Sequence, residues 1–492
     1  MSTTHDELML IDGDLVGSSS GKRFDNINPA TEEVIGQVAD GTLDDVDRAI
    51  AAARTAFDTT EWATDGELRA HGLLQLQTAL ESERELYRQE LIDETGMPRK
   101  LTYVAQLDSV LEDVLRYPAG LIRDFPWERD LGTAETPGGL THRVARKEAI
   151  GVVGAIVPWN VPLETTLHKV SQALATGNTV VLKPAQLTPY NATRLARLVA
   201  EKTDIPPGVF NVVTSSDRSI AETLVTDPRV DMISFTGSTA TGRRIAEKAA
   251  PTIKRLFLEL GGKSANIILD DADLDLYARL AAEAVTAHAG QGCVLPTRLL
   301  APRSSYNEVV ERVVAAIEAI PYGDPNDPNV HMGPLISAQQ RERVLGYMRI
   351  GQDEGARLVT GGGRAEQFDK GYFVQPTVFA DVDNSMRIAQ EEIFGPVLVV
   401  TPYEDDDDAV RIANDSPYGL AANVASGDLE RARAVANRLR VGLVRINGHD
   451  PYAADTPFGG YKQSGLGRQN GIEGFEQYLQ TKSLGFPAGG PR

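Results

Sequence analysis

The sequence predicts an α/β protein with two domains, each built on a mostly parallel β-sheet. Between residues 150 and 260, short apolar runs alternate with amphipathic stretches, and a second series of the same kind begins at Ala265. This alternation is typical of βαβ units, in which a crossover helix joins two parallel strands. The 492 residues also exceed what one compact core holds, since domains usually contain about 100 to 200 residues.

The first series predicts the strands of one sheet. These are Val152–Val157, Thr179–Lys183, Val209–Val213, Met232–Phe235 and Arg255–Leu258. Their spacing leaves room for a helix between successive strands, as right-handed crossovers require. The second series predicts a second sheet, with strands at Ala265–Leu269, Thr297–Ala301, Arg357–Val359, Val397–Pro402, Asn423–Ala425 and Leu443–Ile446.

The remaining segments are assigned by their position relative to these two series. The first 125 residues contain an extended opening and then helical stretches, including Ala51–Phe57 and Gly66–Thr95, which we expect to pack on the first sheet. Residues 126–149 and 471–492 have an extended or irregular pattern, and we expect them to form an arm that pairs with another subunit. The predicted domains are therefore 1–125 with 150–260, then 261–446, and the arm.

Composition excludes several classes of function. The net charge of -20 and the pI of about 4.9 disfavour binding to nucleic acid or to an anionic membrane. The first twenty residues lack a basic segment followed by an apolar one, and the longest apolar run, Ala149–Trp159, is about half a membrane span. A single cysteine forms no internal disulfide, so we expect the cytoplasm, and the scattered histidines predict no metal site.

Two polar clusters follow the first two strands of the first sheet. Asn160 follows Val152–Val157 and precedes Pro162, and its amide can donate a hydrogen bond to an oxyanion or act as a turn residue or helix cap. Lys183 ends the next strand, where a lysine can bind ribose hydroxyls or phosphate, or be an ordinary surface charge. Both residues lie where open α/β sheets bind their ligands.

A third cluster, FTGSTATG, follows the strand Met232–Phe235. Gly237 allows close backbone approach, and Ser238 precedes a helix whose free N–H groups can bind a pyrophosphate. The spacing of Gly237 and Gly242 differs from the GxGxxG dinucleotide fingerprint, so the glycines alone are weak support for a cofactor site.

The fourth cluster combines Glu259 with Cys293. Glu259 follows an apolar strand and precedes two glycines, so it can be either a general base with a raised pKa or a buried salt-bridge partner. Cys293 follows Gly290, Gln291 and Gly292, which would expose its thiol, and backbone amides there could lower its pKa. The alternative for this cysteine is a small core residue.

Together these clusters resemble the aldehyde dehydrogenase superfamily, in order and separation, from about residue 10 to the end. The resemblance continues in EEIFGPV at Glu391–Val397, NDSPYGLAANV at Asn414–Val424 and PFGGYKQSGLGR at Pro457–Arg468. It implies a Rossmann-like cofactor domain, a second α/β catalytic domain and a small oligomerisation arm. It also implies a homodimer or homotetramer that oxidises a small-molecule aldehyde to the acid with NAD.

The resemblance assigns roles to individual residues. Cys293 is implied to be the nucleophile and Glu259 the base that activates water, while Asn160 and the backbone amide of Cys293 form the oxyanion hole. Lys169 matches a lysine that the family keeps near the catalytic glutamate. The residues implied to bind the cofactor are Trp159, Lys183, Gln186, Gly237, Ser238, Glu392 and Phe394.

Two departures from the family pattern bear on specificity. Gln186 occupies a position where many NAD-using members have a glutamate, and because a neutral amide repels a 2′-phosphate less, NADP becomes admissible. Val294 replaces a small residue after the nucleophile. The implied substrate tunnel is lined by Val161, Thr165, His168, Val294, Tyr452 and Phe458, although His168 can also be a packing residue.

Three alternative functions remain to be weighed. A CoA-acylating semialdehyde dehydrogenase generally lacks the catalytic glutamate, and a noncatalytic member would lack Cys293, Glu259 or Asn160. A thiol hydrolase would need a histidine in a recognisable motif, and none is found. No arginine pair indicates a dicarboxylic semialdehyde and no aromatic cage indicates betaine aldehyde, so the substrate is an unspecified aliphatic or aromatic aldehyde.

Overall fold

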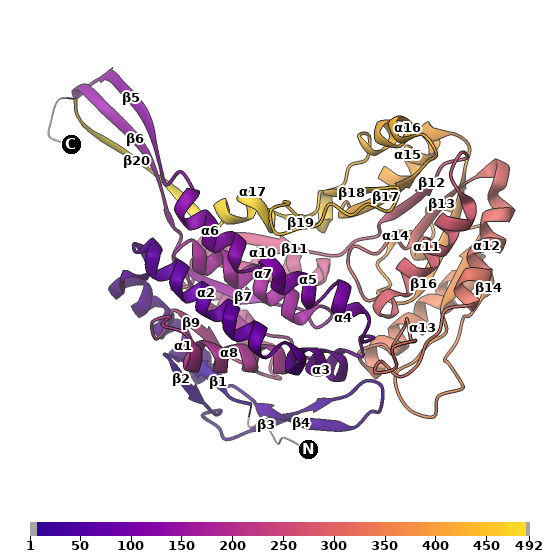
Figure 1. Ribbon diagram of the computed structural model, residues 1–492, viewed down its shortest axis with the longest axis horizontal. Helices are drawn as coiled ribbons and strands as arrows, with labels where there is room; N and C mark the ends of the chain where they lie inside the picture. Colours follow the sequence, from indigo (N-terminus) through magenta and orange to yellow (C-terminus); the bar gives the residue numbers. More distant parts are fainter. Residues whose placement is uncertain (1–6, 489–492) are drawn as a thin grey trace.

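The computed structural model describes residues 7–488 and contains two helix-flanked β-sheets with a projecting three-stranded arm (Figure 1). The predicted α/β class with parallel sheets is confirmed. Among the described residues, none of the helices combines the length and the hydropathy needed to span a membrane.

The first sheet contains all five strands expected between residues 150 and 260, each within one residue of its predicted bounds. They are β7 (Val152–Ile156), β8 (Thr179–Lys183), β9 (Phe210–Val212), β10 (Met232–Thr236) and β11 (Arg255–Glu259). They pair in the order β11-β10-β7-β8-β9 and run parallel. The chain therefore reverses its direction of travel across the sheet at β7 and β10, and such a switch point is where open α/β sheets form a crevice.

Short antiparallel strands extend both edges of this sheet. β1 (Met9–Ile11) and β2 (Asp14–Val16) come from the extended opening and add beside β9, while β19 (Gly465–Leu466) pairs with β11. A separate hairpin joins β3 (Arg23–Ile27) to β4 (Val34–Ala39). These edge strands have only two to six residues, too few for a periodic apolar pattern.

Helices cover both faces of the first sheet, as the apolar clusters show. One face packs against α2 (Gly66–Ser82), α6 (Arg116–Asp124), α7 (Pro162–Ala175) and α8 (Tyr190–Lys202). The other packs against α1 (Leu43–Thr59), α9 (Ser219–Thr226) and α10 (Thr239–Ala249). The remaining helices of this half are α3 (Arg84–Thr95), α4 (Leu101–Val104) and α5 (Asp108–Asp113).

The second sheet has the order β14-β15-β16-β13-β12-β17-β18 and is parallel except for β14. Six strands match expected ones: β12 (Ala265–Ile268), β13 (Arg298–Pro302), β14 (Arg357–Thr360), β16 (Val397–Tyr403), β17 (Ala421–Ala425) and β18 (Leu443–Ile446). β15 (Thr377–Ala380) was not predicted. It is a short buried run between loops, which a pattern search does not separate from coil.

Two groups of helices sandwich this second sheet. α11 (Leu274–Thr286) and α12 (Tyr306–Glu318) pack on one face. The other face packs on α13 (Ala338–Asp353), α14 (Arg387–Gln390), α15 (Asp406–Asn414) and α16 (Leu429–Ala436). Short 3-10 turns occur at Glu61–Ala63, Ala250–Thr252, Ala287–Gly290, Arg303–Ser305 and Lys462–Ser464.

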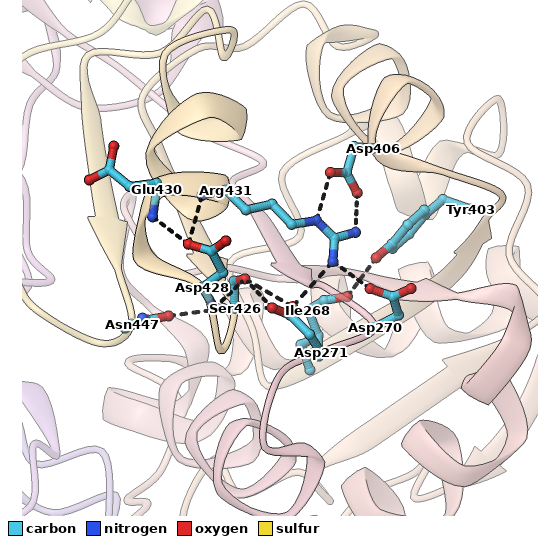
Figure 2. Close-up of polar contacts among 10 residues, drawn as sticks. All are labelled: Ile268, Asp270, Asp271, Tyr403, Asp406, Ser426, Asp428, Glu430, Arg431 and Asn447. Carbon is cyan, nitrogen blue, oxygen red and sulfur yellow. Dashed lines mark hydrogen bonds and ion pairs between the residues drawn. The ribbon is translucent and has the colours of Figure 1, made fainter.

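The carboxyl ends of several strands of the second sheet are occupied by a network around Arg431 (Figure 2). The Arg431 guanidinium pairs with Asp270 at 2.6 Å and Asp406 at 2.7 Å, and lies 3.4 Å from Asp271. Ser426 donates to Asp271 as well. These groups pair with one another at a partly exposed surface, where side-chain exposure is 32% for Arg431 and 57% for Asp270.

The arm is an antiparallel sheet of β5 (Glu128–Thr136), β6 (Gly139–Ala149) and β20 (Leu479–Pro487). It projects away from both sheets (Figure 1). One expectation for the segment 471–492 is wrong: it begins with a helix, α17 (Gly471–Glu476), because Phe475 is buried in the core beneath α7. Residues 489–492 of that segment lie outside the described residues.

Candidate active site

A cavity of about 880 Å³ opens where the first sheet's strands end and the second sheet's strands begin. Residues after β7, β8, β10 and β11 line one side, and residues before β13 and β16 line the other. Of the residues predicted for the site, it is lined by Trp159, Asn160, Val161, Thr165, Lys183, Gln186, Gly237, Ser238, Glu259, Glu392, Cys293, Val294, Phe394, Tyr452 and Phe458. Lys169 and His168 are buried behind it.

The loop that carries Cys293 has an unusual backbone. His288, Ala289 and Gly290 all have positive φ, at 48°, 53° and 73°. A side chain at Gly290 would collide with the backbone of Gly395, so the third of these residues has to be glycine. Such strain persists only where the surrounding structure fixes it, and it frequently marks functional sites.

Cys293 is partly exposed, and it faces the cavity. A Cβ atom at Gly262 would lie 2.5 Å from the Cys293 carbonyl oxygen, so glycine allows the loop after β11 to approach the cysteine loop. The predicted lowering of the thiol pKa by a backbone amide is present but outweighed: burial raises the pKa of Cys293, and the charges of Glu259, Glu392 and Glu164 raise it further. The thiol therefore needs a base or an added positive charge before it can react.

Asn160 is held against the same loop. Its side-chain amide donates a 2.9 Å hydrogen bond to the Gln291 carbonyl oxygen, and the residue is 4% exposed. The alternative of a helix cap is wrong, because Val161 occupies the N-cap position of α7 and Pro162 follows in its first turn. The amide is thus positioned beside the cysteine loop by backbone contact.

Glu259 ends β11 with neither carboxylate oxygen hydrogen-bonded to any described residue. Burial raises its pKa to about 8, although the charges of Lys169 and Arg468 oppose the shift. Lys169 lies over the Phe257 ring at 4.3 Å, also without a hydrogen-bond partner, and burial lowers its pKa to about 7. Glu259 therefore forms no hydrogen-bonded salt bridge with a described residue, and both of its carboxylate oxygens can still accept a hydrogen bond in the cavity.

The end of the cavity near β8 carries positive charge. The Lys183 ammonium donates to the carbonyl oxygens of Pro184 and Ser215, and burial together with Arg218 lowers its pKa to about 8. Gln186, Ser216 and Arg218 line the same region. These donors suit the hydroxyls or phosphate of a ribose.

The middle of the cavity faces the N-terminus of α10. Ser238 is its N-cap, and its hydroxyl accepts from the Thr241 N–H at 3.2 Å. The free N–H groups of this first turn and the helix dipole favour a phosphate group. Gly237 donates its N–H to the Glu259 carbonyl oxygen, which ties this turn to the end of β11.

Glu392 and Phe394 approach from the second sheet. Glu392 accepts a 3.0 Å hydrogen bond from the Gly262 N–H, and burial raises its pKa to about 7. Phe394 has a φ of 62° and packs edge-on against Trp159, with ring centroids 5.4 Å apart. The residues along the cavity thus provide ribose donors, a phosphate-binding helix end and an aromatic wall, which together fit a dinucleotide. No cluster of metal-ligating side chains occurs within residues 7–488.

Comparison of this sequence with known protein families shows which family has this arrangement of residues. Residues 15–484 match the model of the aldehyde dehydrogenase family. The chain belongs to the aldehyde dehydrogenase family. It is 44% identical to 3-succinoylsemialdehyde-pyridine dehydrogenase from a Pseudomonas species, covering 96% of this chain and 97% of the relative. It is 43% identical to geranial dehydrogenase from Castellaniella defragrans, covering 98% and 99%.

A solved structure of an aldehyde dehydrogenase agrees over nearly the whole chain. The Mycobacterium tuberculosis enzyme, complexed with NAD+, superposes with a TM-score of 0.94 at 43% identity, covering 99% of this chain and 100% of that one. Family membership makes this protein an oxidoreductase of aldehydes, and neither the CoA-acylating nor the noncatalytic alternative is favoured. Glu259, which CoA-acylating members generally lack, lines the cavity with Cys293.

Several residues of this aldehyde dehydrogenase site were not predicted from sequence. They are Leu101, Gln106, Glu164, Arg218, Arg343, Arg445, Asp450 and Gln469. Glu164 could have been found, because it immediately precedes the predicted tunnel residue Thr165 in the first turn of α7. Most of the others lie on loops or helices distant in sequence from the motifs, and only the fold brings them to the cavity.

Proposed function

We propose that this chain oxidises an aldehyde to the carboxylic acid with NAD, through a thioester formed on Cys293. The observation that carries the proposal is that Cys293 and the unpartnered carboxylate of Glu259 line one cavity with the cofactor-binding residues. A nucleophile and a base in one desolvated cavity are what covalent catalysis followed by hydrolysis requires.

The first half of the reaction centres on Cys293. Its sulfur, once deprotonated, attacks the aldehyde carbon, and the carbonyl oxygen becomes an alkoxide. The Asn160 amide and the Cys293 backbone N–H donate to this oxygen, and preorganised donors of this kind stabilise the developing charge. A bound nicotinamide cofactor, which Lys183, Ser238 and Glu392 would hold, would accept the hydride from the aldehyde carbon. Loss of hydride leaves the acyl group as a thioester on Cys293.

Glu259 acts in the second half of the reaction, the hydrolysis of the thioester. Its carboxylate removes a proton from a water molecule, which attacks the thioester carbon, and Cys293 leaves as the thiolate while the acid departs. A pKa of about 8 allows this group both to accept a proton and to release it near neutral pH. We assign Lys169 a positioning role, because its buried charge opposes the upward shift of the Glu259 pKa.

For the cofactor we propose NAD as the preferred acceptor, with NADP accepted less well. Gln186 lacks the carboxylate that would repel a 2′-phosphate, and Lys183 and Arg218 supply positive charge in the same region. Initial rates with both cofactors, and the same rates for Gln186→Glu, test this. We expect the variant to raise the NAD/NADP ratio of kcat/KM by about tenfold or more. A tenfold change corresponds to about 1.4 kcal/mol, which repulsion between the new carboxylate and a 2′-phosphate can supply.

The assembly is proposed to be a homodimer or homotetramer joined through the arm, and its compartment to be the cytoplasm. Exposed Leu131, Leu140 and Phe486 on the three arm strands support association of the arm. The chain's only cysteine is consistent with a reducing compartment. Aldehydes of the aliphatic or aromatic type are the proposed substrates.

The test of the function is Cys293→Ala. We expect aldehyde oxidation to fall by more than roughly 10³-fold, because covalent catalysis is lost. NAD should still bind to this variant, as measured by the quenching of protein fluorescence. Activity close to that of the wild-type chain would refute the proposal.

A further inference from the structure

The part of the cavity beyond Cys293 contains a carboxylate that the proposed reaction does not use. Glu164 lies in the first turn of α7, between the tunnel residues Val161 and Thr165, and lines the cavity. Its charge contributes to the raised pKa of Cys293, so it lies within electrostatic reach of the reacting sulfur. Its side chain is 17% exposed, and that exposed part faces the substrate end of the cavity.

Hydrogen bonds hold Glu164 in place. The Tyr452 hydroxyl interacts with the Glu164 carboxylate and opposes the rise in its pKa that burial causes, and the same hydroxyl lies 3.2 Å from Nε2 of His168. When Glu164 is ionised it can only accept, so Tyr452 donates to it, and Nε2–H of His168 donates to Tyr452. His168 is therefore a neutral support for this chain of hydrogen bonds, consistent with a pKa that burial and the charge of Lys169 lower to about 4.

Within residues 7–488, no lysine or arginine forms an ion pair with Glu164. His168 lies 4.0 Å away but is neutral near pH 7. The guanidinium of Arg445, which lines the same region, pairs instead with Asp450 at 2.7 Å. Burial and the charge of Asp450 raise the pKa of Glu164, while the hydrogen bond from Tyr452 favours its ionised form. Because the charges of Arg445 and Asp450 cancel, an ionised Glu164 gives the substrate end of the cavity a negative charge.

We infer that Glu164, held by Tyr452 and His168, selects aldehydes that carry a hydrogen-bond donor a short distance from the carbonyl carbon, with a protonated amine favoured over a hydroxyl. A buried acceptor that lacks a donor raises the free energy of the complex. A charge-assisted hydrogen bond to an ammonium group lowers that free energy more than a hydrogen bond to a neutral hydroxyl does. An aldehyde that ends in a carboxylate meets repulsion at the same place. This inference rests on the proposed function and names the substrate class of that site.

The experiment compares kcat/KM for four short aldehydes with NAD: butanal, 3-hydroxypropanal, 3-aminopropanal and succinate semialdehyde. For the wild-type chain we expect 3-aminopropanal to exceed butanal by about 10- to 100-fold, 3-hydroxypropanal to fall between them, and succinate semialdehyde to be lowest. Glu164→Leu should reverse the order of 3-aminopropanal and butanal. Glu164→Gln should keep the preference for the hydroxyl and lose that for the ammonium, because the amide oxygen still accepts without charge.

The matched control is Glu430→Gln, which removes one charge at a 79% exposed side chain on α16. We expect the wild-type ratios in this variant. A wild-type ratio of 3-aminopropanal to butanal below one, or a ratio that neither Glu164 variant changes, would overturn the inference. If the wild-type chain oxidised none of the four aldehydes, the proposed function would fail instead, so the two failures are distinguishable.

Discussion

At the scale of single residues, the site is governed by desolvation of ionisable groups. Burial raises the pKa of Cys293, Glu259 and Glu392 together, and the charges of the two carboxylates add to the shift at the thiol. Each group is thus held near its neutral form until a cofactor or substrate changes its surroundings. A carboxyl group with a pKa of about 8, such as Glu259, can accept and release a proton near neutral pH, where an isolated carboxyl group would be fully ionised.

The raised pKa of Glu259 predicts how hydrolysis depends on pH. Only the deprotonated carboxylate can accept a proton from water, so the rate of thioester hydrolysis should rise with pH and level off above about 8. Single-turnover measurement of acid release across this range tests the prediction. The same profile should be flat and low in Glu259→Gln, whereas an unchanged rise in that variant would assign the titration to another group.

Asn160 offers a second test at this scale. Removal of one donor to a developing oxyanion typically lowers kcat by about 10²- to 10³-fold, and we expect that loss for Asn160→Ala. Asn160→Asp keeps the shape of the side chain but replaces the donor with an acceptor, so its loss should be as large. Steady-state kcat is the measurement, and an Asp variant with near wild-type kcat would show that the reaction needs no hydrogen-bond donor at this position.

At the scale of elements, the sequence predicts most strands and the residues at their ends. It does not predict the short strands, or which side chains are buried behind the cavity. The apolar runs predict β7, β8, β10 and β11 to within a residue, and their carboxyl ends place Asn160, Lys183, Ser238 and Glu259 at one edge. Sequence pattern alone left Cys293 open between nucleophile and core residue. The family resemblance supplied its role, and the structure places it on the cavity wall.

Other features depend on tertiary contact and left no local signal. β15 and the edge strands are too short for periodicity, and α17 forms because Phe475 is buried beneath α7. His168, predicted as either a tunnel residue or a packing residue, is buried and does not line the cavity, and the same holds for Lys169. The upward shift of the Cys293 pKa likewise depends on tertiary structure, through burial first and then through carboxylates from β11, the loop before β16 and α7.

Close approach of two loops gives a prediction at this scale. Gly262→Ala places a methyl group against the Cys293 carbonyl oxygen and should lower kcat by about tenfold or more and destabilise the fold by about 1–3 kcal/mol. The control is Gly346→Ala within α13, where the nearest atom is 3.9 Å away. That change should leave kcat unaltered and raise stability slightly, since alanine favours helix. Paired kcat and thermal unfolding measurements compare the two; equal kcat values would contradict the close-contact argument.

At the scale of the whole molecule, the active site lies between the two sheets while the arm projects from them (Figure 1). The arm exposes Phe486 on β20, whose side chain is 46% exposed and whose ring packs against that of His142 with centroids 5.0 Å apart. Exposed apolar side chains on extended edge strands, such as Leu131, Leu140 and Phe486 here, are stabilised when the strands pair with another chain. At the carboxyl end of the second sheet, Arg431 pairs with Asp270 and Asp406 (Figure 2), whereas the cavity lies where the strands of the second sheet begin.

Phe486→Glu tests the role of the arm. A charge on this strand should shift the molecular mass in solution towards that of a single chain, because association would have to bury it. The control is Leu429→Glu, which places the same charge at a 55% exposed position at the start of α16. Light scattering after gel filtration gives both masses. A wild-type chain that is monomeric, or an unchanged mass in Phe486→Glu, would contradict the assignment of the arm.

The central claim is that Cys293 carries the acyl group and Glu259 releases it. Glu259→Gln, mixed with an aldehyde and NAD and quenched rapidly, should gain the mass of one acyl group per chain, located on the peptide that contains Cys293. Reduced cofactor should appear in the same amount as the adduct and then almost cease. An unmodified Cys293 peptide together with continued steady turnover would contradict the account.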